Sequence, residues 1–400
     1  MPVVSIVKVG NDQAEDAVRR AVGLAGGLPS EVGSGATVLI KPNVVNASRS
    51  GSGRITDARV TEAVAKMVLE RDPKRVVIGE GSSVGYDFPG RLDSLHCLEA
   101  SGTADVARRL GVDLVDLNRD ETVWVQAEDA FLMDRFGVAK TALEADVILD
   151  LPVVKTHVRT GITCGLKNMK GVLPGDEKKR THRLGLDRAI VDLNRVMKPH
   201  FTVVDALVGM QGTNTDPEDR VVVGCVVAGA DVVAVDAVCA AMVGFDVDQV
   251  LHVKLAGEAG LGVADLDRIE VRGETIAAVR RRFVPFHEAA YGRFGDATVI
   301  EKDACTGCMG EIFSTFVYLN RAGFEDRLRD LTMILGTPDE APTVRGATVV
   351  VGKCAQAYRN LGVFVPGCPP HGMAITDAAC EALGIDKEVV HQAVEKLHDF

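Results

Sequence analysis

Residues 146–157 of the chain read Asp-Val-Ile-Leu-Asp-Leu-Pro-Val-Val-Lys-Thr-His, an apolar run that gives way to polar and cationic side chains. The part Asp146–Leu151 predicts a buried β-strand, because short apolar runs of this kind are typical of strands covered on both faces. In parallel sheets, ligands bind beyond the carboxyl ends of the strands. The residues that follow Leu151 therefore stand where an α/β protein places its binding site.

Strand and helix patterns alternate through the first half of the chain. Strands are predicted at Val3–Val9, Thr37–Ile40, Arg75–Ile78 and Asp113–Asp116, and helices at Gln13–Ala25, Asp57–Arg71 and Thr103–Leu110. This alternation implies right-handed crossovers and a mostly parallel sheet with helices on both faces. The composition agrees, since 46% of the residues are hydrophobic and only 4% are aromatic, which favours a core of Val, Ala, Leu and Ile. We therefore predict an α/β fold.

The length of 400 residues exceeds what one hydrophobic core usually supports. We predict an α/β domain with an anion-binding cleft over residues 1–285, and a smaller C-terminal α/β metal-binding domain over residues 286–400, where the texture of the sequence changes. The apolar stretch Val221–Phe245 is interrupted by Asp231 and Asp236. It predicts a strand, a turn and a helix rather than a membrane span.

The charge and the cysteine count limit the expected partners and compartment. A formal net charge of −11 argues against nucleic acid, whose phosphates need a basic face. The first residues show no basic segment leading into an apolar run, and the nine cysteines show no disulfide-framework pattern. We expect a cytoplasmic protein with neither a nucleic acid nor a membrane as its partner.

Four cysteines near the end of the chain suggest a metal centre. Cys305 and Cys308 stand in Cys-Thr-Gly-Cys, whereas Cys354 and Cys368 lie in Gly-Lys-Cys-Ala and Gly-Cys-Pro-Pro. Two thiolates separated by two residues can grip one metal, and two more from separate loops complete a four-sulfur cage. We predict a [4Fe-4S] cluster on these four ligands. Structural zinc and unrelated core thiols are the alternatives.

A cationic stretch follows the strand at 146–151. Between residues 155 and 170, cationic and imidazole side chains are interleaved with hydroxyl and amide groups: Lys155, Thr156, His157, Arg159, Lys167, Asn168 and Lys170. Such a stretch in an acidic protein suits a bound carboxylate or phosphate, and a helix predicted from near Gly161 would add its positive end. The alternative is a solvated basic loop. We predict His157 as the general acid or base, with Lys155 second, and Thr156, Lys167 and Asn168 as substrate-binding residues.

Three further polar residues stand at the ends of neighbouring predicted strands: Lys41, Asn43 and Glu80. We predict that they contact the same anionic substrate. Each has a structural alternative, because a lysine there can extend to solvent, and the other two can cap a helix. His182 lies in the basic segment Lys-Lys-Arg-Thr-His-Arg, which predicts a mobile loop rather than a catalytic position.

Five segments of the chain resemble the DUF362 family of prokaryotic proteins, in the family's order and within residues 1–250. The segments are Val38–Val44, Val76–Gly81, Leu151–His157, Gly165–Gly171 and Ala230–Asp236. The resemblance implies an α/β fold and a Lys/Thr/His cleft that tolerates anions. It also implies iron–sulfur ligands in many members, but it supplies no agreed reaction. Family members with clusters often carry compact cysteine runs, whereas the dispersed cysteines of this chain favour a single cluster.

Both candidate sites together predict an iron–sulfur oxidoreductase that acts on a small anionic organic substrate and exchanges electrons with a redox partner protein. One alternative is an electron carrier or a cluster-bearing accessory protein without its own catalysis. Another is a zinc-stabilised binding protein or transferase. The sequence sets no oligomeric state.

Overall fold

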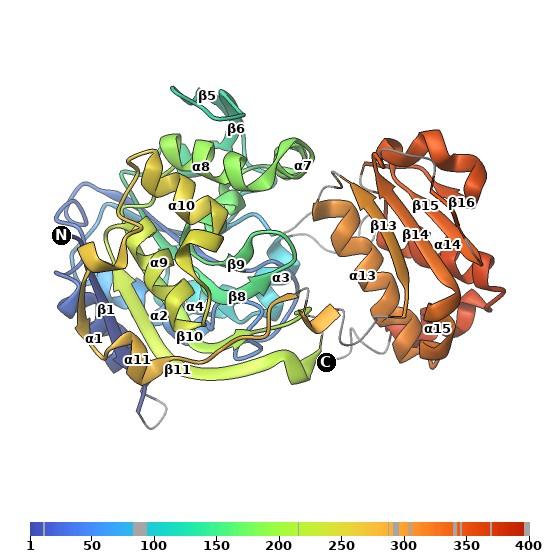
Figure 1. Cartoon of the computed structure of the whole chain (residues 1–400). Helices are drawn as coiled ribbons and strands as arrows, with labels where there is room; N and C mark the ends of the chain where they lie inside the picture. Colours follow the sequence, from blue (N-terminus) through green and yellow to red (C-terminus); the bar gives the residue numbers. More distant parts are fainter. Residues whose placement is uncertain are drawn as a thin grey trace. The chain divides into compact units, whose positions relative to one another are not determined.

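The computed structural model describes the chain except for residues 11–12, 83–93, 215, 287, 291–295, 303, 305, 339–341, 345, 369 and 396–400, and except for the side chains of residues 183, 306, 307 and 395. The chain divides into two compact units, Met1–Pro285 and Phe286–Phe400. We call them unit 1 and unit 2 and describe each by itself (Figure 1).

Unit 1 is built on a ten-stranded sheet in which the order of the main path is β12-β1-β11-β10-β7-β2-β3-β4, with β8 and β9 attached beside β10. The strands are β1 (Val3–Lys8), β2 (Thr37–Pro42), β3 (Arg75–Glu80), β4 (Asp113–Asp116), β7 (Val147–Leu151), β8 (Val153–His157), β9 (Gly161–Thr163), β10 (Phe201–Met210), β11 (Arg220–Gly229) and β12 (Glu270–Gly273). A separate two-stranded ribbon of β5 (Thr122–Gln126) and β6 (Arg135–Ala139) projects from the unit (Figure 1).

Most of the strand pairs in this sheet are parallel. Parallel pairing joins β10, β7, β2, β3 and β4 in that order, and also β1 with β12. The long strand β11 runs antiparallel to both β1 and β10. The segment Val38–Ile40 has no exposed surface, as expected for strands covered on both faces. The predicted α/β fold with a mostly parallel sheet is confirmed.

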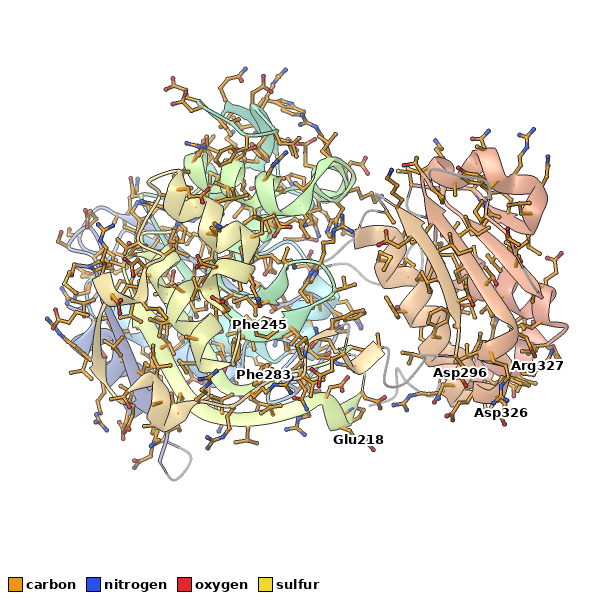
Figure 2. The ribbon with its side chains drawn as sticks, in the orientation of Figure 1. Glu218, Phe245, Phe283, Asp296, Asp326 and Arg327 are labelled. Carbon is orange, nitrogen blue, oxygen red and sulfur yellow. The ribbon has the colours of Figure 1, made fainter. Side chains whose placement is uncertain are left out.

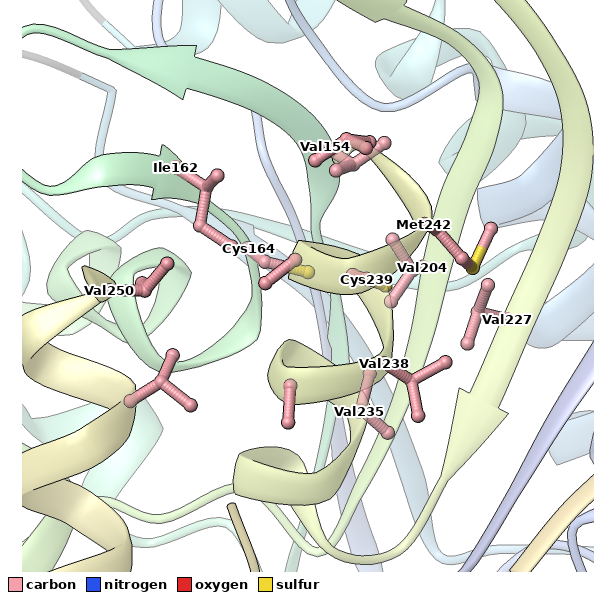
Figure 3. Close-up of a cluster of buried hydrophobic side chains, with 14 of the residues drawn as sticks. Val154, Ile162, Cys164, Val204, Val227, Val235, Val238, Cys239, Met242 and Val250 are labelled. Atoms are coloured by element: carbon pink, nitrogen blue, oxygen red, sulfur yellow. The ribbon is translucent and has the colours of Figure 1, made fainter. Parts of the chain in front are cut away.

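Helices cover both faces of the sheet. The helices of unit 1 are α1 (Ala14–Leu24), α2 (Ala58–Leu69), α3 (Ser94–Ala100), α4 (Thr103–Leu110), α5 (Lys140–Leu143), α6 (Gly165–Asn168), α7 (Gly175–Leu184), α8 (Leu186–Val196), α9 (Val232–Met242), α10 (Leu251–Glu258) and α11 (Ile276–Val279). One core cluster packs α1, α2 and α4 against the sheet. Another packs α8, α9 and α10 against the opposite face, and Figure 3 shows its centre around Val204, Val227 and Val238.

The apolar stretch at 221–245 folds as predicted from its two aspartates. It forms β11, a turn and α9, and Asp231 begins the helix by accepting hydrogen bonds from the backbone N–H groups of Val233 and Ala234. Among the described residues, no helix is both long enough and apolar enough to cross a membrane.

The helix predicted from near Gly161 is wrong. Residues Gly161–Thr163 instead form β9, which pairs antiparallel with β8 and places Thr163 opposite Lys155. Gly161 has a φ of +71° at the turn of this hairpin and lies against the ring of Phe245, which Figure 2 labels. The next helix, α6, begins only at Gly165 and is four residues long. A turn and a strand therefore follow β8, where the sequence predicted the start of a helix.

Unit 2 contains a smaller, fully parallel sheet in the order β13-β14-β15-β16. Its strands are β13 (Thr298–Lys302), β14 (Leu331–Gly336), β15 (Ala347–Val351) and β16 (Val363–Val365), and its helices are α13 (Thr306–Arg321), α14 (Gly372–Leu383) and α15 (Lys387–Glu395). The hydroxyls of Thr315 and Thr376, 3.0 Å apart, join α13 to α14 in the interior. The unit is a second α/β body with its own core.

Candidate functional site

The candidate site of unit 1 lies at the carboxyl ends of neighbouring strands. Lys41 stands near the end of β2, Glu80 ends β3, and Lys155 lies on β8, which follows β7 after Pro152. Because β3, β2 and β7 are adjacent and parallel, their ends meet at one edge of the sheet. We use the name lysine cleft for the group of polar side chains gathered at this edge, most of which are buried: Lys41, Asn43, Glu80, Asp150, Lys155, His157, Lys167, Asn168, Lys170, Lys178 and His182.

Lys41 and Glu80 form a buried ion pair. The Lys41 Nζ lies 3.0 Å from Glu80 Oε2, and the two side chains are 0% and 3% exposed. Glu80 also accepts hydrogen bonds from the backbone N–H groups of Val44 and Gly81. Gly171 packs directly on the pair, since a Cβ there would lie 1.9 Å from Glu80 Oε1 and 2.5 Å from Lys41 Nζ. Both predicted substrate contacts are thus engaged with each other, and they hold the loops of the cleft together.

A chain of side-chain hydrogen bonds runs from Lys155 across the cleft. The Lys155 Nζ donates to Asn43 Oδ1 at 2.8 Å, and Asn43 Nδ2 donates to Asn168 Oδ1 at 2.7 Å. Asn168 Nδ2 then donates to Asp150 Oδ1, also at 2.7 Å. Asp150 has no exposed surface, and burial raises the pKa of its carboxyl well above the ordinary value. The structure therefore places Asn43, Asn168 and Lys155, three of the predicted site residues, in one hydrogen-bonded group, and their contact with a substrate stays a prediction.

Four lysines of this region differ from ordinary surface lysines. Lys155, Lys170 and Lys178 are at most 8% exposed, and Lys167 is half-buried. Burial lowers the pKa of Lys155 and of Lys178 to about 7, and that of Lys167 to about 8. It holds the pKa of Lys170 well below its ordinary value, and nearby lysines add to the effect. Near neutral pH these amines therefore lose their protons more readily than ordinary lysines do.

The contacts of the buried lysines are to neutral groups. Lys155 donates to Asn43 and to the carbonyl oxygen of Arg54, at 2.6 Å. Lys178 donates to Asn118 Oδ1 at 2.5 Å, and Lys170 Nζ lies 2.8 Å from His182 Nε2. Within the described part of the chain, none of the four lysines forms a salt bridge with a carboxylate. Any of these four amines that is protonated therefore has no carboxylate paired with it in the described part of the chain.

The two histidines of the cleft are neutral bases in their surroundings. Burial lowers the pKa of both His157 and His182 well below the ordinary value, and neighbouring lysines lower it further. The Nδ1 of His157 accepts from the backbone N–H groups of Arg159 and Thr160, each at 3.3 Å. The neutral ring therefore carries its proton on Nε2. That N–H is available to donate a hydrogen bond.

Thr156 faces away from the lysines. Its hydroxyl donates to the carbonyl oxygen of Gly212 at 2.9 Å, and it has no exposed surface. Alternation along β8 explains this, because successive side chains point to opposite faces of the sheet. Of the predicted substrate-binding residues, Thr156 is the one that the structure places outside the lysine cleft.

The cysteine loops of unit 2 adjoin one another in part. A Cβ on Gly352 would lie 3.1 Å from the sulfur of Cys308, and the backbone N–H of Lys353 donates to the carbonyl oxygen of Gly367 at 2.9 Å. These contacts bring the loops of Cys354 and Cys368 towards Cys308. The Cys354 side chain is exposed, and Cys305 lies outside the described residues. Among the described residues, no three His, Cys, Asp or Glu side chains are placed to hold a metal ion.

A comparison with family models identifies the fold family. The model described as "Domain of unknown function (DUF362)" matches residues 38–241, just over half of the chain. The chain belongs to the DUF362 family. The matched range contains every residue of the lysine cleft named above and none of the four cysteines predicted as metal ligands. Family membership is therefore established over the region that carries the cleft.

Two known proteins resemble this DUF362 protein. The Thylakoid-associated protein sll1697 of Synechocystis sp. is 27% identical over 219 residues, a match that covers 53% of the chain and 64% of that relative. The chain thus spans less than two thirds of the relative's length. The solved lactate racemase apoprotein from Thermoanaerobacterium thermosaccharolyticum is 12% identical with a TM-score of 0.41, and the match covers 57% of this chain and 54% of that one.

The sequence of this DUF362 protein did not predict that three further residues belong to the lysine cleft. Lys178 and His182 lie on α7, an ordered helix, and not on the mobile loop that the basic segment suggested. Helix α7 packs close to Gly81, because a Cβ atom built on Gly81 would lie 2.6 Å from the Nζ of Lys178. Asp150 lies in an otherwise apolar strand, and a charged residue in such a strand is the sequence feature that could have revealed its role. Each of these placements depends on contacts between distant parts of the chain.

Proposed function

We propose that this DUF362 protein is an enzyme that binds a small anionic organic substrate in the lysine cleft and transfers a proton there. The observation that carries the proposal is the burial of Lys155, Lys170 and Lys178 against neutral partners. Burying a cation without a counter-ion costs free energy, and natural structures retain such groups at functional sites. A bound carboxylate or phosphate supplies the missing charge.

Lys155 is the group best suited to move the proton. Its amine has a pKa of about 7, so that both protonation states are populated near neutral pH. His157, the first choice from the sequence, has its Nδ1 turned to the backbone N–H groups of Arg159 and Thr160. In our proposal, the Nε2–H of His157 donates a hydrogen bond that orients the substrate, and the protonated Lys155 delivers its proton to the substrate and then takes a proton back.

The experiment is a screen followed by a reaction assay. Small carboxylates and phosphates are tested for their ability to raise the melting temperature, because a ligand that binds only the folded state stabilises it. We expect several anions to do so and neutral analogues to have no effect. Anions that stabilise the protein are then incubated with it in D2O, and NMR follows conversion or exchange of their carbon-bound protons. If no anion stabilises the protein, the proposal is wrong. Unchanged turnover in a His157→Asn variant removes His157 from the reaction.

A cysteine-ligated [4Fe-4S] centre in unit 2 is a second proposal, and it would give the protein an electron-transfer role, either as an oxidoreductase or as a carrier or accessory protein. The close approach of Gly352 to the Cys308 sulfur and the Lys353–Gly367 hydrogen bond favour it, because they gather three cysteine loops. The described side chains do not form a complete four-sulfur cage, since Cys354 is exposed. The proposed proton transfer therefore uses only residues of the lysine cleft. Zinc on the same cysteines is the alternative.

Analysis of iron, inorganic sulfide and zinc in protein purified without air tests this centre. We expect a brown protein with broad visible absorbance, and a Cys308→Ser variant that loses most of its iron. Cys380→Ser is the matched control, because Cys380 is also buried and lies on α14, outside the predicted ligand set. Zinc without iron would support the zinc-stabilised alternative, and the absence of both metals would leave the cysteines as packing residues. A cytoplasmic location also stays a proposal, because the Synechocystis relative is described as thylakoid-associated.

A further inference from the structure

When its amines are protonated, the lysine cleft holds more positive charge than one carboxylate can neutralise. The charged and titratable groups around the four lysines come from seven elements and one loop: Lys41 on β2, Arg54 after β2, Glu80 on β3, Asp116 on β4, Asp150 on β7, His157 on β8, His182 on α7 and Asp187 on α8. Asp150 accepts a hydrogen bond from Asn168, and burial favours its neutral form. Glu80 is already paired with Lys41. Asp116 lies 3.6 Å from Arg119, and Asp187 lies 3.5 Å from His252. In the described part of the chain, none of these carboxylates forms an ion pair with the four lysines, although Asp116 Oδ2 and Asp187 Oδ1 accept no hydrogen bond.

The lysine amines are close enough to affect one another. Burial is the main cause of the lowered pKa of Lys155 and of Lys170; the charge of Lys167 lowers both further, and that of Lys178 adds to the effect on Lys170. Like charges repel strongly where water is scarce. A ligand with a single negative charge can neutralise only one of these amines. A second amine then stays either protonated without a counter-charge or unprotonated.

We propose that the substrate of the lysine cleft is a small organic dianion, a dicarboxylate or a phosphate monoester, and that the protein takes up a proton when this dianion binds. This inference rests on the proposed function, since it concerns the same cleft. A dianion lies between Lys155 and the amines from the 167–178 segment and neutralises two of them. The cleft would bind a dianion more tightly than a monoanion of the same shape, because the monoanion makes one fewer charge-assisted hydrogen bond in a site with little water.

The proton uptake follows from the burial of Lys155 and Lys178. Both have a pKa of about 7, so that at pH 8 most of these amines are neutral in the free protein. A bound dianion favours the charged form and raises both pKa values, so binding near pH 8 draws a proton from solution. Near pH 6 both amines are already charged, and little proton is taken up. The affinity therefore falls as the pH rises above 7.

Titration calorimetry on the full chain tests the inference with two pairs of probes. Methyl phosphate is compared with dimethyl phosphate, and succinate with monomethyl succinate, because each pair differs mainly by one negative charge. We expect at least one dianion to bind about tenfold or more tightly than its monoanionic partner. At pH 8 its binding enthalpy should differ between Tris and triethanolamine, whose ionisation enthalpies differ, in the direction of proton uptake. Near pH 6 this difference should shrink.

Two neighbouring lysines of α7 provide the matched variants. Lys178 is 8% exposed and lies in the cleft, whereas Lys179 is 36% exposed in its side chain and pairs with Asp176. We expect Lys178→Met to reduce the dianion preference and the proton uptake, and Lys179→Met to change neither.

The outcomes separate the two proposals. Equal binding of dianions and monoanions, or dianion binding at pH 8 without proton uptake, overturns the present inference and leaves an anion-binding cleft. Binding of neither kind of probe overturns the proposed function together with the inference. The comparison of probes uses the unmodified protein, so its result does not depend on whether Lys178→Met folds.

Discussion

Replacing Glu80 with glutamine is expected to lower the free energy of unfolding of unit 1 by about 3–5 kcal/mol. The carboxylate is 3% exposed and is the ion-pair partner of Lys41, which has no exposed surface. It also accepts hydrogen bonds from the N–H groups of Val44 and Gly81. The amide removes the negative charge, so that the buried ammonium of Lys41 loses its compensation.

Urea denaturation followed by tryptophan fluorescence measures this change in unit 1. The chain has a single tryptophan, Trp124, and it lies in β5 of unit 1. Glu274→Gln is the matched control, because Glu274 forms an exposed ion pair with Lys8, in which the side chains are 38% and 52% exposed. For such a pair we expect a loss of at most about 1 kcal/mol.

A double variant separates the lost charge from the lost packing. Lys41→Met combined with Glu80→Gln removes the uncompensated ammonium and keeps a side chain of similar length. We expect the double variant to recover much of the stability that Glu80→Gln loses, because a buried ion pair replaced by apolar groups is often neutral in its effect. If Glu80→Gln alone costs less than about 1 kcal/mol, Lys41 is hydrated or neutral in the folded protein, and the ion pair does not anchor the cleft.

The fold of unit 1 could be predicted because its strands are short apolar runs separated by amphipathic helices. The polar residues at the ends of these runs, such as Lys41, Glu80 and Lys155, do lie at one edge of the sheet. That convergence follows from parallel pairing alone, which local sequence patterns indicate well. Predicting which of these residues face each other requires tertiary information, and Thr156 shows the limit: its hydroxyl bonds to Gly212, on the far side of β8.

The remaining features depended on long-range packing. The residues Ile162 and Thr163 are β-branched, and they pair with β8 to complete a hairpin. Gly161 forms the turn of this hairpin and does not start a helix. The basic segment around His182 became ordered because α7 packs its Lys178 against Asn118 and its His182 against Lys170. A run of cationic residues in a sequence predicts a solvated surface segment. In this protein several of these cations are buried together, and their burial can be seen only in the three-dimensional structure.

Lys155→Met is expected to weaken the binding of the stabilising anions by about 100-fold and to abolish turnover. Lys155 is the cleft amine that begins the hydrogen-bond chain through Asn43 and Asn168 to Asp150. Methionine keeps the length of the side chain and removes both the charge and the donor. The dissociation constant of the tightest anion from the stabilisation screen, measured by calorimetry at pH 7, checks the expectation. Lys179→Met should bind that anion like the unmodified protein.

The same variant should change the pH dependence of stability in a defined direction. The pKa of Lys155 is about 7 in the folded protein against an ordinary value of 10.5, so between these values the unfolded chain holds a proton that the folded chain lacks. This lysine therefore destabilises the fold progressively as the pH falls from 10.5 to 7, and its full cost is present below pH 7. Lys155→Met removes that cost, which offsets the loss of the hydrogen bonds to Asn43 and Arg54. Relative to the unmodified protein, the variant should gain stability at pH 6 compared with pH 10.

These two readouts distinguish a functional lysine from a structural one. A lysine retained only for its hydrogen bonds would, when replaced, lower stability at every pH and leave the affinity for anions unchanged in the fraction that stays folded. A lysine retained for its substrate costs stability near neutral pH, and its replacement removes binding without unfolding the protein. Unchanged anion affinity in Lys155→Met would therefore show that the chain from Lys155 to Asp150 only supports the loops. The anion would then bind through the amines of residues 167–178.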